Sequence, residues 1–312
     1  MAKLTKALLV ITDLEPDDLI AIKTLWLTSS QLASRGYTSI WLVVCGNADV
    51  EKRTWLVENM PSTSWQGLEC EYFAGTLNKP EHDSQFAPWS QHADKLTPGI
   101  SDAIVLAPCD DLLPVVQSHN CQLQTVFNQG GGAPATGVVT FNWANVENTK
   151  KMHHAMQSLP GCTYYLINSE FVKSEQPEYP YKGGSVHRGN AETLHSALMN
   201  NKEIRKVVDK WNETARSNPR LPAQVRALLG KPLQFTPADV LVVYGFLVVC
   251  GIWYDPGLHW TRYGDINIME NCKVQYVHPE DKRTGAFNVI KSISFSEFEQ
   301  YIADTHNDSQ GC

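Results

Sequence analysis

The stretch ALLVITDLEPDDLIAI, residues 7–22, indicates how the chain folds. Residues 7–12 are a short continuous apolar run, which is typical of a strand buried on both faces of a parallel sheet. The residues that follow the turn have apolar side chains at helical spacing, with Pro16 and an acidic pair in the first helical turn. A buried strand that passes through a polar turn into a helix is the repeating unit of α/β folds.

The turn between this strand and helix carries four acidic side chains, Asp13, Glu15, Asp17 and Asp18. Like charges this close repel one another, and a helix N-terminus needs only one or two of them. Two interpretations stand at this point: an acidic turn that caps the helix, or a cation site. Asp13 ends the strand and Asp18 begins the helix, so both can face one point, and clustered carboxylates suit Ca²⁺ or Mg²⁺.

The alternation of strand, polar turn and helix continues along the chain. Further buried strands are predicted at 38–47, 103–111, 124–134 and 162–170, and late strands near 273–278 and 287–293. We predict an α/β fold: a single domain over residues 1–312, with a mainly parallel sheet and helices on both faces. Residues 190–230 are predicted to form a helical insertion, and 257–263 (GLHWTRY) a loop. In such sheets the active site lies at the C-terminal ends of the strands.

Composition excludes several classes of protein. The net charge of −7 disfavours nucleic acid as a partner. The most apolar segment, residues 240–253, is too short to span a bilayer, and no signal peptide is recognisable. The eight cysteines include no C-x-x-C pair, which favours buried free thiols in a reducing, cytoplasmic setting. His153 and His154 follow two lysines on a predicted helix, where a solvated basic face is expected. P-loop, G-x-G-x-x-G and G-x-S-x-G motifs are absent from the sequence.

Several segments together resemble one family, the calcium-dependent nucleoside hydrolases (inosine-uridine-preferring ribohydrolases). Their hallmark D-x-D-P-x-x-D-D follows the first strand, and TDLEPDD matches its second half. The likeness continues in order along nearly the whole chain. The further matching segments are CGNADVEKRTWLV (45–57), EYFAGTLNKP (71–80), IVLAPCDDLLPV (104–115), GGGAPATGVVTFNWANVEN (130–148) and FTPADVLVVYGF (235–246).

The resemblance implies a nucleoside-hydrolase-like fold and a set of roles. Ca²⁺ would be held by Asp13, Asp18, Asp239 and the backbone carbonyl of Asp110. Asp13 would also be the catalytic base, accepting the proton of the water that the metal holds for attack on the anomeric carbon. The sugar would be bound by Asp17 through a ribose hydroxyl, with Asn47 and Asn142 completing the cradle.

The chain also departs from the family pattern. The family's first aspartate is Ile11 here, and its glutamate at the sugar's 5′ end is Thr140. The partner amide of that glutamate falls near Pro134, and the histidine that protonates the leaving group is Ala238. We expect Thr140 to accept a 5′-substituted, nucleotide-like riboside, because a neutral hydroxyl does not repel a phosphate.

Trp260, in the segment 257–263, is a candidate to stack on the base, although packing on the sheet edge is the plainer interpretation. The expected function is a Ca²⁺-dependent N-glycosyl hydrolase of nucleoside metabolism. Its partner would be a small-molecule riboside, not nucleic acid or membrane, and the chain would form a homo-oligomer (dimer or tetramer). The alternatives are a catalytically silent ribosyl-ligand binding protein on the same fold and, more remotely, an enzyme of phosphate chemistry.

Overall fold

The acidic turn joins a buried strand to a helix, as the sequence predicts. In the computed structural model β1 (Lys6–Thr12) leads through residues 13–15 into α1 (Pro16–Leu27). Every residue of β1 after Lys6 is buried, as expected for a strand covered on both faces. The structure describes residues 6–45, 48, 50–76, 86–131, 145–168, 205–206, 209, 238–253, 258–263, 265–268, 274–277 and 286–292.

A sheet of nine strands, in the order β4-β3-β2-β1-β5-β6-β7-β11-β8, forms the centre of the described part. Neighbouring strands of this sheet run parallel, except that β8 runs antiparallel to β11 at one edge. A separate antiparallel pair is formed by β9 and β10. The strands after β1 are β2 (Tyr37–Val44), β3 (Glu69–Ala74), β4 (Ala87–Pro88), β5 (Ile100–Val105), β6 (Thr125–Gln129), β7 (Thr163–Ile167), β8 (His259–Tyr263), β9 (Asp265–Ile268), β10 (Val274–Val277) and β11 (Ala286–Ser292).

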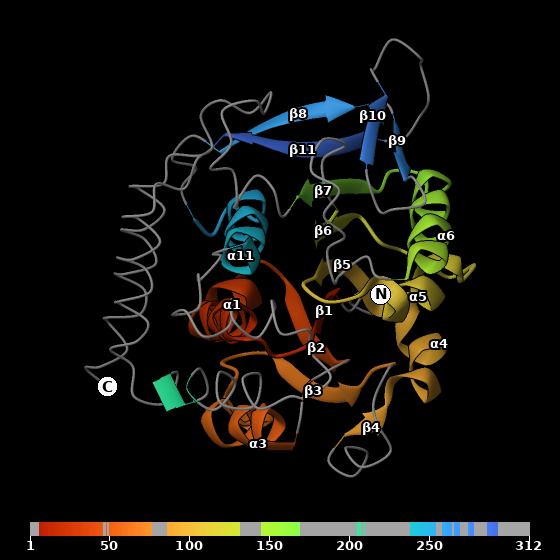
Figure 1. Cartoon of the computed structure of the whole chain (residues 1–312). Helices are drawn as coiled ribbons and strands as arrows, with labels where there is room; N and C mark the ends of the chain where they lie inside the picture. The colour runs from red at the N-terminus through yellow and green to blue at the C-terminus, as the bar shows by residue number, and fades with distance from the viewer. Residues whose placement is uncertain are drawn as a thin grey trace, which may run out of the picture.

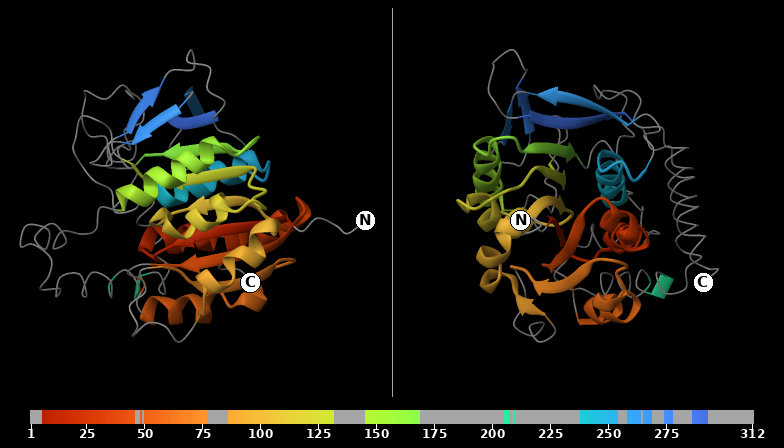
Figure 2. Two further views of the ribbon diagram at one scale, coloured as in Figure 1. Left: turned by 90° about the vertical axis from the view of Figure 1, so that its right-hand side faces the viewer. Right: turned by 180° about the vertical axis from the view of Figure 1, so that it is seen from behind.

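Helices cover both faces of the sheet (Figures 1 and 2). One face carries α1, α3 (Val50–Asn59) and α11 (Ala238–Val249), and α1 and α11 lie side by side. The other face carries α4 (Ala93–Leu96), α5 (Leu113–Gln117) and α6 (Val146–Gln157). The remaining helical segments are α2 (Ser29–Ser34) and the 3-10 turns η1 (Ser62–Ser64), η3 (Trp89–Gln91), η4 (Thr97–Gly99) and η5 (Cys109–Asp111).

Two apolar clusters fill the space between the sheet and its helices. Side chains alternate across each strand, so Leu8 and Val10 pack on the α1 side while Leu9 and Ile11 pack on the α6 side. The predicted α/β class, the mainly parallel sheet and the two helical layers are thus confirmed.

Residues 257–263 were predicted as a loop, and this is wrong for the described part, because His259–Tyr263 form β8. This strand has no continuous apolar run, since its sequence HWTRY mixes polar and aromatic side chains that are exposed or half-buried. Backbone pairing with β11 defines it. An apolar pattern therefore cannot reveal it, as is common for edge strands.

The solvated basic face predicted for α6 is wrong at His153, which is only 2 % exposed, whereas His154 is exposed. The His153 ring lies 2.9 Å from the carbonyl oxygen of Thr149 through Nδ1, and 2.9 Å from the Tyr164 hydroxyl through Nε2. A carbonyl only accepts, so Nδ1 carries the proton and Nε2 accepts from Tyr164. Both ring nitrogens are satisfied inside the core, and burial lowers the pKa of His153 to about 4.

Other expectations meet the described residues only in part. The predicted helical insertion at 190–230 lies outside them except at 205–206 and 209, which are helical. Within the described part no cysteine forms a disulfide, and Cys45, Cys70 and Cys109 are buried. Cys272 and Cys312 lie outside it.

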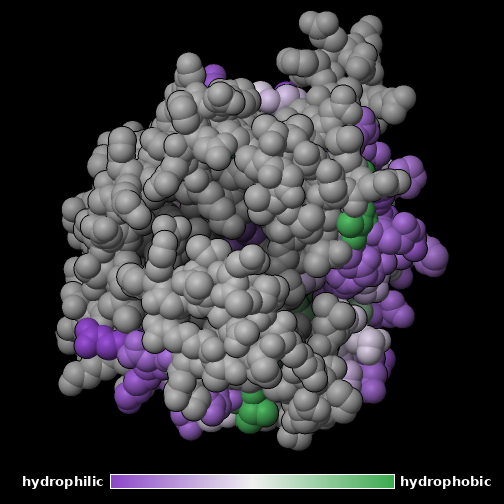
Figure 3. Space-filling view, viewed as in Figure 1, coloured by the Kyte–Doolittle hydropathy of each residue, from purple (hydrophilic) through white to green (hydrophobic). Residues whose placement is uncertain are grey.

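The apolar segment at 240–253 belongs largely to α11, whose described side chains are mostly buried. None of the helices in the described ranges is long and apolar enough to cross a membrane. On the face shown in Figure 3 the described residues that reach the surface are mostly hydrophilic. Large exposed hydrophobic side chains within these ranges are Val50, Val57 and Val249.

Candidate functional site

The chain turns sharply between β1 and α1, and hydrogen bonds hold this turn. Leu14 is buried and has a φ of +55°, a left-handed conformation that is strained for a leucine. Its N–H donates to Thr12 Oγ1 at 3.0 Å. Asp18 Oδ2 accepts from the Thr12 hydroxyl and, at 3.0 Å, from the N–H of Asp13. The turn therefore holds the Asp18 carboxylate at the C-terminal edge of the sheet.

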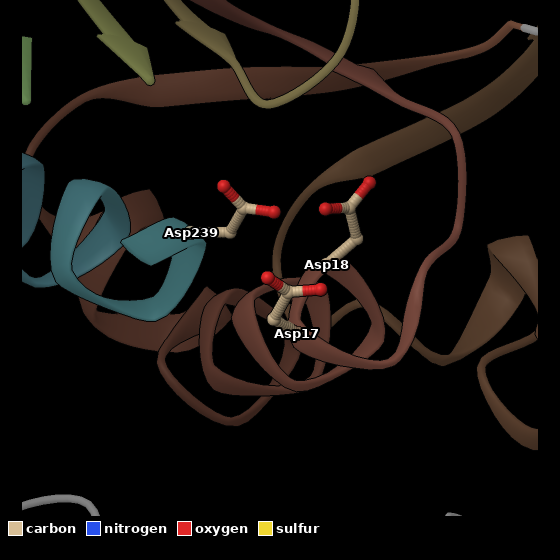
Figure 4. Close-up of side chains that lie close together, drawn as sticks. All are labelled: Asp17, Asp18 and Asp239. Atoms are coloured by element: carbon tan, nitrogen blue, oxygen red, sulfur yellow. The ribbon is translucent and has the colours of Figure 1, made fainter. Parts of the chain in front are cut away.

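Three carboxylates meet at this edge. Asp17 and Asp18 come from the first turn of α1, and Asp239 comes from the first turn of α11. Figure 4 shows the three side chains directed toward one another between the two helix starts. One oxygen of each lies within 4.8 Å of the others, close enough for all three to hold one metal ion.

Burial of these acids opposes their negative charge. Asp18 is fully buried and Asp239 is 5 % exposed, whereas Asp17 is half-buried. Burial raises the pKa of Asp17 to about 7, with the charge of Glu15 adding to the effect. Burial likewise raises the pKa of Asp18 to about 6. The pKa of Asp239 lies well above its usual range because of burial and then the charges of Asp17 and Asp18.

The contacts within the cluster fit a cation. The Oδ2 atom of Asp18 is held by the Thr12 hydroxyl and the N–H of Asp13. The Oδ1 atoms of Asp18 and Asp239 are buried, and neither has a hydrogen-bond partner among the described residues. A buried carboxylate oxygen without a partner is energetically unfavourable, and a bound divalent cation would satisfy both oxygens and remove the repulsion. The donors are all oxygens, which suits Ca²⁺ or Mg²⁺.

Asp13 lies beside this cluster and not within the group of three. It is 3 % exposed, and its pKa is raised well above the usual range by burial and then by the charge of Asp18. The charge of the Lys52 ammonium acts in the opposite direction and lowers the pKa of Asp13.

Lys52 and Arg53 are both buried in α3, at 5 % and 0 % exposure. Sequence reasoning missed them, because two charged residues near a helix start look solvated and carry no signal of burial.

The turn after β5 brings a second acidic pair to the same edge. Asp110 Oδ1 accepts from the side-chain amides of Asn145, at 2.8 Å, and Asn148. Asp111 is 1 % exposed, and its carboxylate accepts from the N–H of Thr76. Burial raises the pKa of Asp111 to about 6. Sequence reasoning expected both acids in this turn but gave a role to Asp110 alone.

The buried Cys45 thiol lies near both acidic turns, the one after β1 and the one after β5. It lies at the end of β2, and its Sγ is 3.5 Å from the carbonyl oxygen of Thr12. Its pKa is raised by burial and then by carboxylates of both groups, Asp111 on one side and Asp13 on the other. The two acidic turns therefore lie within electrostatic reach of one point.

The remaining predicted site residues divide into two sets. Asn47, Thr140 and Asn142 lie outside the described residues. Trp260 is in β8, where its ring packs edge-on against Tyr165, with ring centroids 4.9 Å apart, and near Phe127. It also faces Gly245, six residues beyond Asp239 and about 9 Å along the α11 axis. Its contacts in the structure are thus those of an aromatic group on the sheet.

No protein family model and no curated protein matches the chain. Solved structures do match it, among them the type III effector protein XopQ complexed with adenosine diphosphate ribose. That match has a TM-score of 0.53 and covers 99 % of this chain and 95 % of that chain, at 11 % sequence identity. The two proteins share a fold. This agrees with the fold that the sequence resemblance implies, and at such low identity it extends no further than the fold.

Proposed function

We propose that the chain is a Ca²⁺-dependent hydrolase that cleaves the N-glycosidic bond of a ribonucleoside or a 5′-substituted riboside. The observation that carries this proposal is the meeting of Asp17, Asp18 and Asp239 at the C-terminal edge of the sheet. Ligands bind at this edge in open parallel sheets. The order of sequence segments that resemble nucleoside hydrolases supports the choice of reaction.

The cation would be held by Asp18 and Asp239, joined by Asp13 and the backbone carbonyl of Asp110. When bound, Ca²⁺ supplies positive charge and fixes the position of oxygen atoms near it, without strongly acidifying water. A protein base is needed for that reason. The oxygens of Asp18 and Asp239 that lack partners support their assignment as ligands.

Asp13 would accept the proton of the attacking water. A carboxylate must be ionised to do so. Burial and the charge of Asp18 raise the pKa of Asp13 and oppose this form, whereas the charges of Lys52 and of a bound cation would favour it. The water oxygen bonds to the anomeric carbon, the bond from that carbon to the base nitrogen breaks, and its electron pair leaves with the base. The clustered carboxylates favour the positive charge that develops on the sugar in an oxocarbenium-like transition state. Asp17 would bind a ribose hydroxyl.

A substituent at the 5′ end is part of the proposal. Thr140 stands where the family has a glutamate, so the repulsion of a phosphate by a carboxylate is absent from this position. The XopQ structure, which shares the fold, is a complex with adenosine diphosphate ribose, itself a 5′-substituted riboside. The buried Lys52 adds positive charge near the acidic cluster.

The alternative function is a ribosyl-ligand binding protein without catalysis. Ala238 favours it, because the family's leaving-group acid, a histidine, stands at this position and alanine cannot donate a proton. Both functions require the cation and a bound riboside. Only the hydrolase would release base and free sugar.

The test is a substrate panel with the purified, Ca²⁺-loaded protein. Uridine, inosine, their 5′-monophosphates and adenosine diphosphate ribose are incubated with it, and the released base and sugar are measured by chromatography, because adenosine diphosphate ribose is itself a reducing sugar. We expect release of sugar, with a higher kcat/KM for the monophosphates than for the plain nucleosides. Binding by calorimetry without release of sugar would favour the silent binding protein. Absence of both binding and release across the panel would contradict both functions.

A further inference from the structure

Each residue of the η5 turn is held by a side chain or backbone group from another element. Cys109 Sγ lies 3.5 Å from Thr149 Oγ1 of α6. The Asp110 carboxylate is held by Asn145 and Asn148 at the start of α6.

Asp111 holds the turn from the opposite side. Both of its carboxylate oxygens accept from the Thr76 N–H, at 2.9 and 3.0 Å, and its carbonyl accepts from Trp89 Nε1 at 3.0 Å. Gly75 has no space for a side chain, because a Cβ there would lie 2.3 Å from Asp111 Oδ2. Two neighbouring acids are therefore pulled toward two different elements, and the backbone between them has little freedom.

The Asp110 side chain is turned toward α6. Its Oδ1 accepts two amide N–H groups, from Asn145 and Asn148. Asn145 is also the N-cap of α6, since its side-chain oxygen accepts from the N–H of Asn148 at 3.2 Å. The rigid start of a helix thus fixes the carboxylate, and through it the orientation of the Asp110 backbone.

We propose that Asn148 and Asn145 are positioning residues, which by holding the Asp110 carboxylate aim the Asp110 backbone carbonyl at the cation. This inference rests on the proposed function, which makes that carbonyl a ligand. It deepens the proposal by assigning a task to two residues at the start of α6 that hold Asp110 and are not among the proposed ligands. Outer residues that orient a ligand typically change metal affinity by about 10–100-fold when they are lost.

The test is the affinity for Ca²⁺, measured by calorimetry on the full chain. In Asn148→Asp a carboxylate replaces the amide that donates to Asp110, so the two groups repel and the turn must shift. We expect Ca²⁺ binding to weaken by about 10-fold. Added negative charge alone would strengthen cation binding, so weaker binding identifies the loss of orientation. The fold should be retained, because an acid in the first helical turn is favourable.

A second variant and a control complete the experiment. In the double variant Asp110→Asn with Asn148→Asp, the amide and the carboxylate exchange places, and the net charge equals that of the wild type. We expect this exchange to restore most of the Ca²⁺ affinity. The control is Glu147→Gln, which changes an exposed charge in the same turn, next to Lys151 and not Asp110. Its affinity should equal that of the wild type.

The single variant Asp110→Asn separates the carbonyl from the side chain as the ligand. Asparagine keeps an oxygen that can accept from Asn145 and Asn148, so Ca²⁺ affinity should fall only slightly. A loss as large as that of Asn148→Asp would show that the carboxylate itself binds Ca²⁺ and would overturn the inference. Wild-type affinity in Asn148→Asp would also overturn it while leaving the proposed function intact. A wild-type chain that binds no Ca²⁺ would contradict the proposed function itself.

Discussion

Replacement of Asp239 by asparagine should change the stability of the protein in opposite directions with and without Ca²⁺. The oxygens of Asp17, Asp18 and Asp239 lie within 4.8 Å of one another. At that distance each pair of negative charges repels by roughly 3.5 kcal/mol at an effective dielectric constant of about 20. Asparagine has nearly the shape of aspartate, and in Asp239→Asn it removes two of the three repulsions.

The net gain without a cation is smaller than the sum of these repulsions. Burial, and then the charges of Asp17 and Asp18, raise the pKa of Asp239 well above its usual range, so protonation of Asp239 already relieves part of the repulsion. We therefore expect Asp239→Asn to be more stable than the wild type by about 2 kcal/mol at about pH 8 in EDTA. For a chain of this size that raises the Tm by about 3 °C.

With Ca²⁺ the order should reverse. A ligand at about 100 times its Kd stabilises the folded state by about 2.7 kcal/mol, and the wild type should gain this amount. Asp239→Asn lacks one ligand charge and should gain little. The assay is thermal unfolding at the same pH, with EDTA and with a Ca²⁺ series. A variant that is less stable than the wild type in EDTA, or that keeps the full Ca²⁺ shift, would refute the assignment of a cation site to this cluster.

Three further predictions follow from single residues. Asp13→Asn removes the proposed base, so kcat should fall by about 10²–10⁴-fold; a variant with wild-type kcat would transfer the role elsewhere. Gly75→Ala would place a Cβ 2.3 Å from Asp111 Oδ2, and urea unfolding should show a loss of about 1–3 kcal/mol; an unchanged midpoint would mean that the turn yields easily. Burial lowers the pKa of His153 from 6.5 to about 4, so between these two pH values the unfolded chain binds the extra proton. Stability relative to His153→Gln should therefore fall by up to about 3 kcal/mol as the pH drops through this window, and a pH-independent difference would contradict the buried neutral ring.

The sequence by itself determined the interior of the fold. The strands β1, β2 and β7 are apolar runs between polar turns, and a strand buried on both faces needs such a run wherever it lies. The apolar segment 240–253 was recognised as too short to span a bilayer, and its apolar character agrees with the burial of α11. The acidic turn at 13–18 also stood out, because repulsion between neighbouring charges is evident without coordinates.

Tertiary structure alone decided which distant groups meet. Asp239 is separated from Asp18 by most of the chain, and only the packing of α11 against α1 brings the two carboxylates together. Without the resemblance no spacing would have selected it. The edge strand β8 was missed for a related reason, since it is defined by backbone pairing with β11 and not by its own side chains.

The contacts of His153 and Asp111 were equally hidden in the sequence. Both are polar residues in segments that look solvated, and both are buried because hydrogen-bond partners come from elsewhere, Tyr164 in one case and Thr76 in the other. Local patterns report the average preference of a side chain for water. Whether a polar group can be buried depends on the partner that the fold supplies, and that partner is known only when the chain has folded.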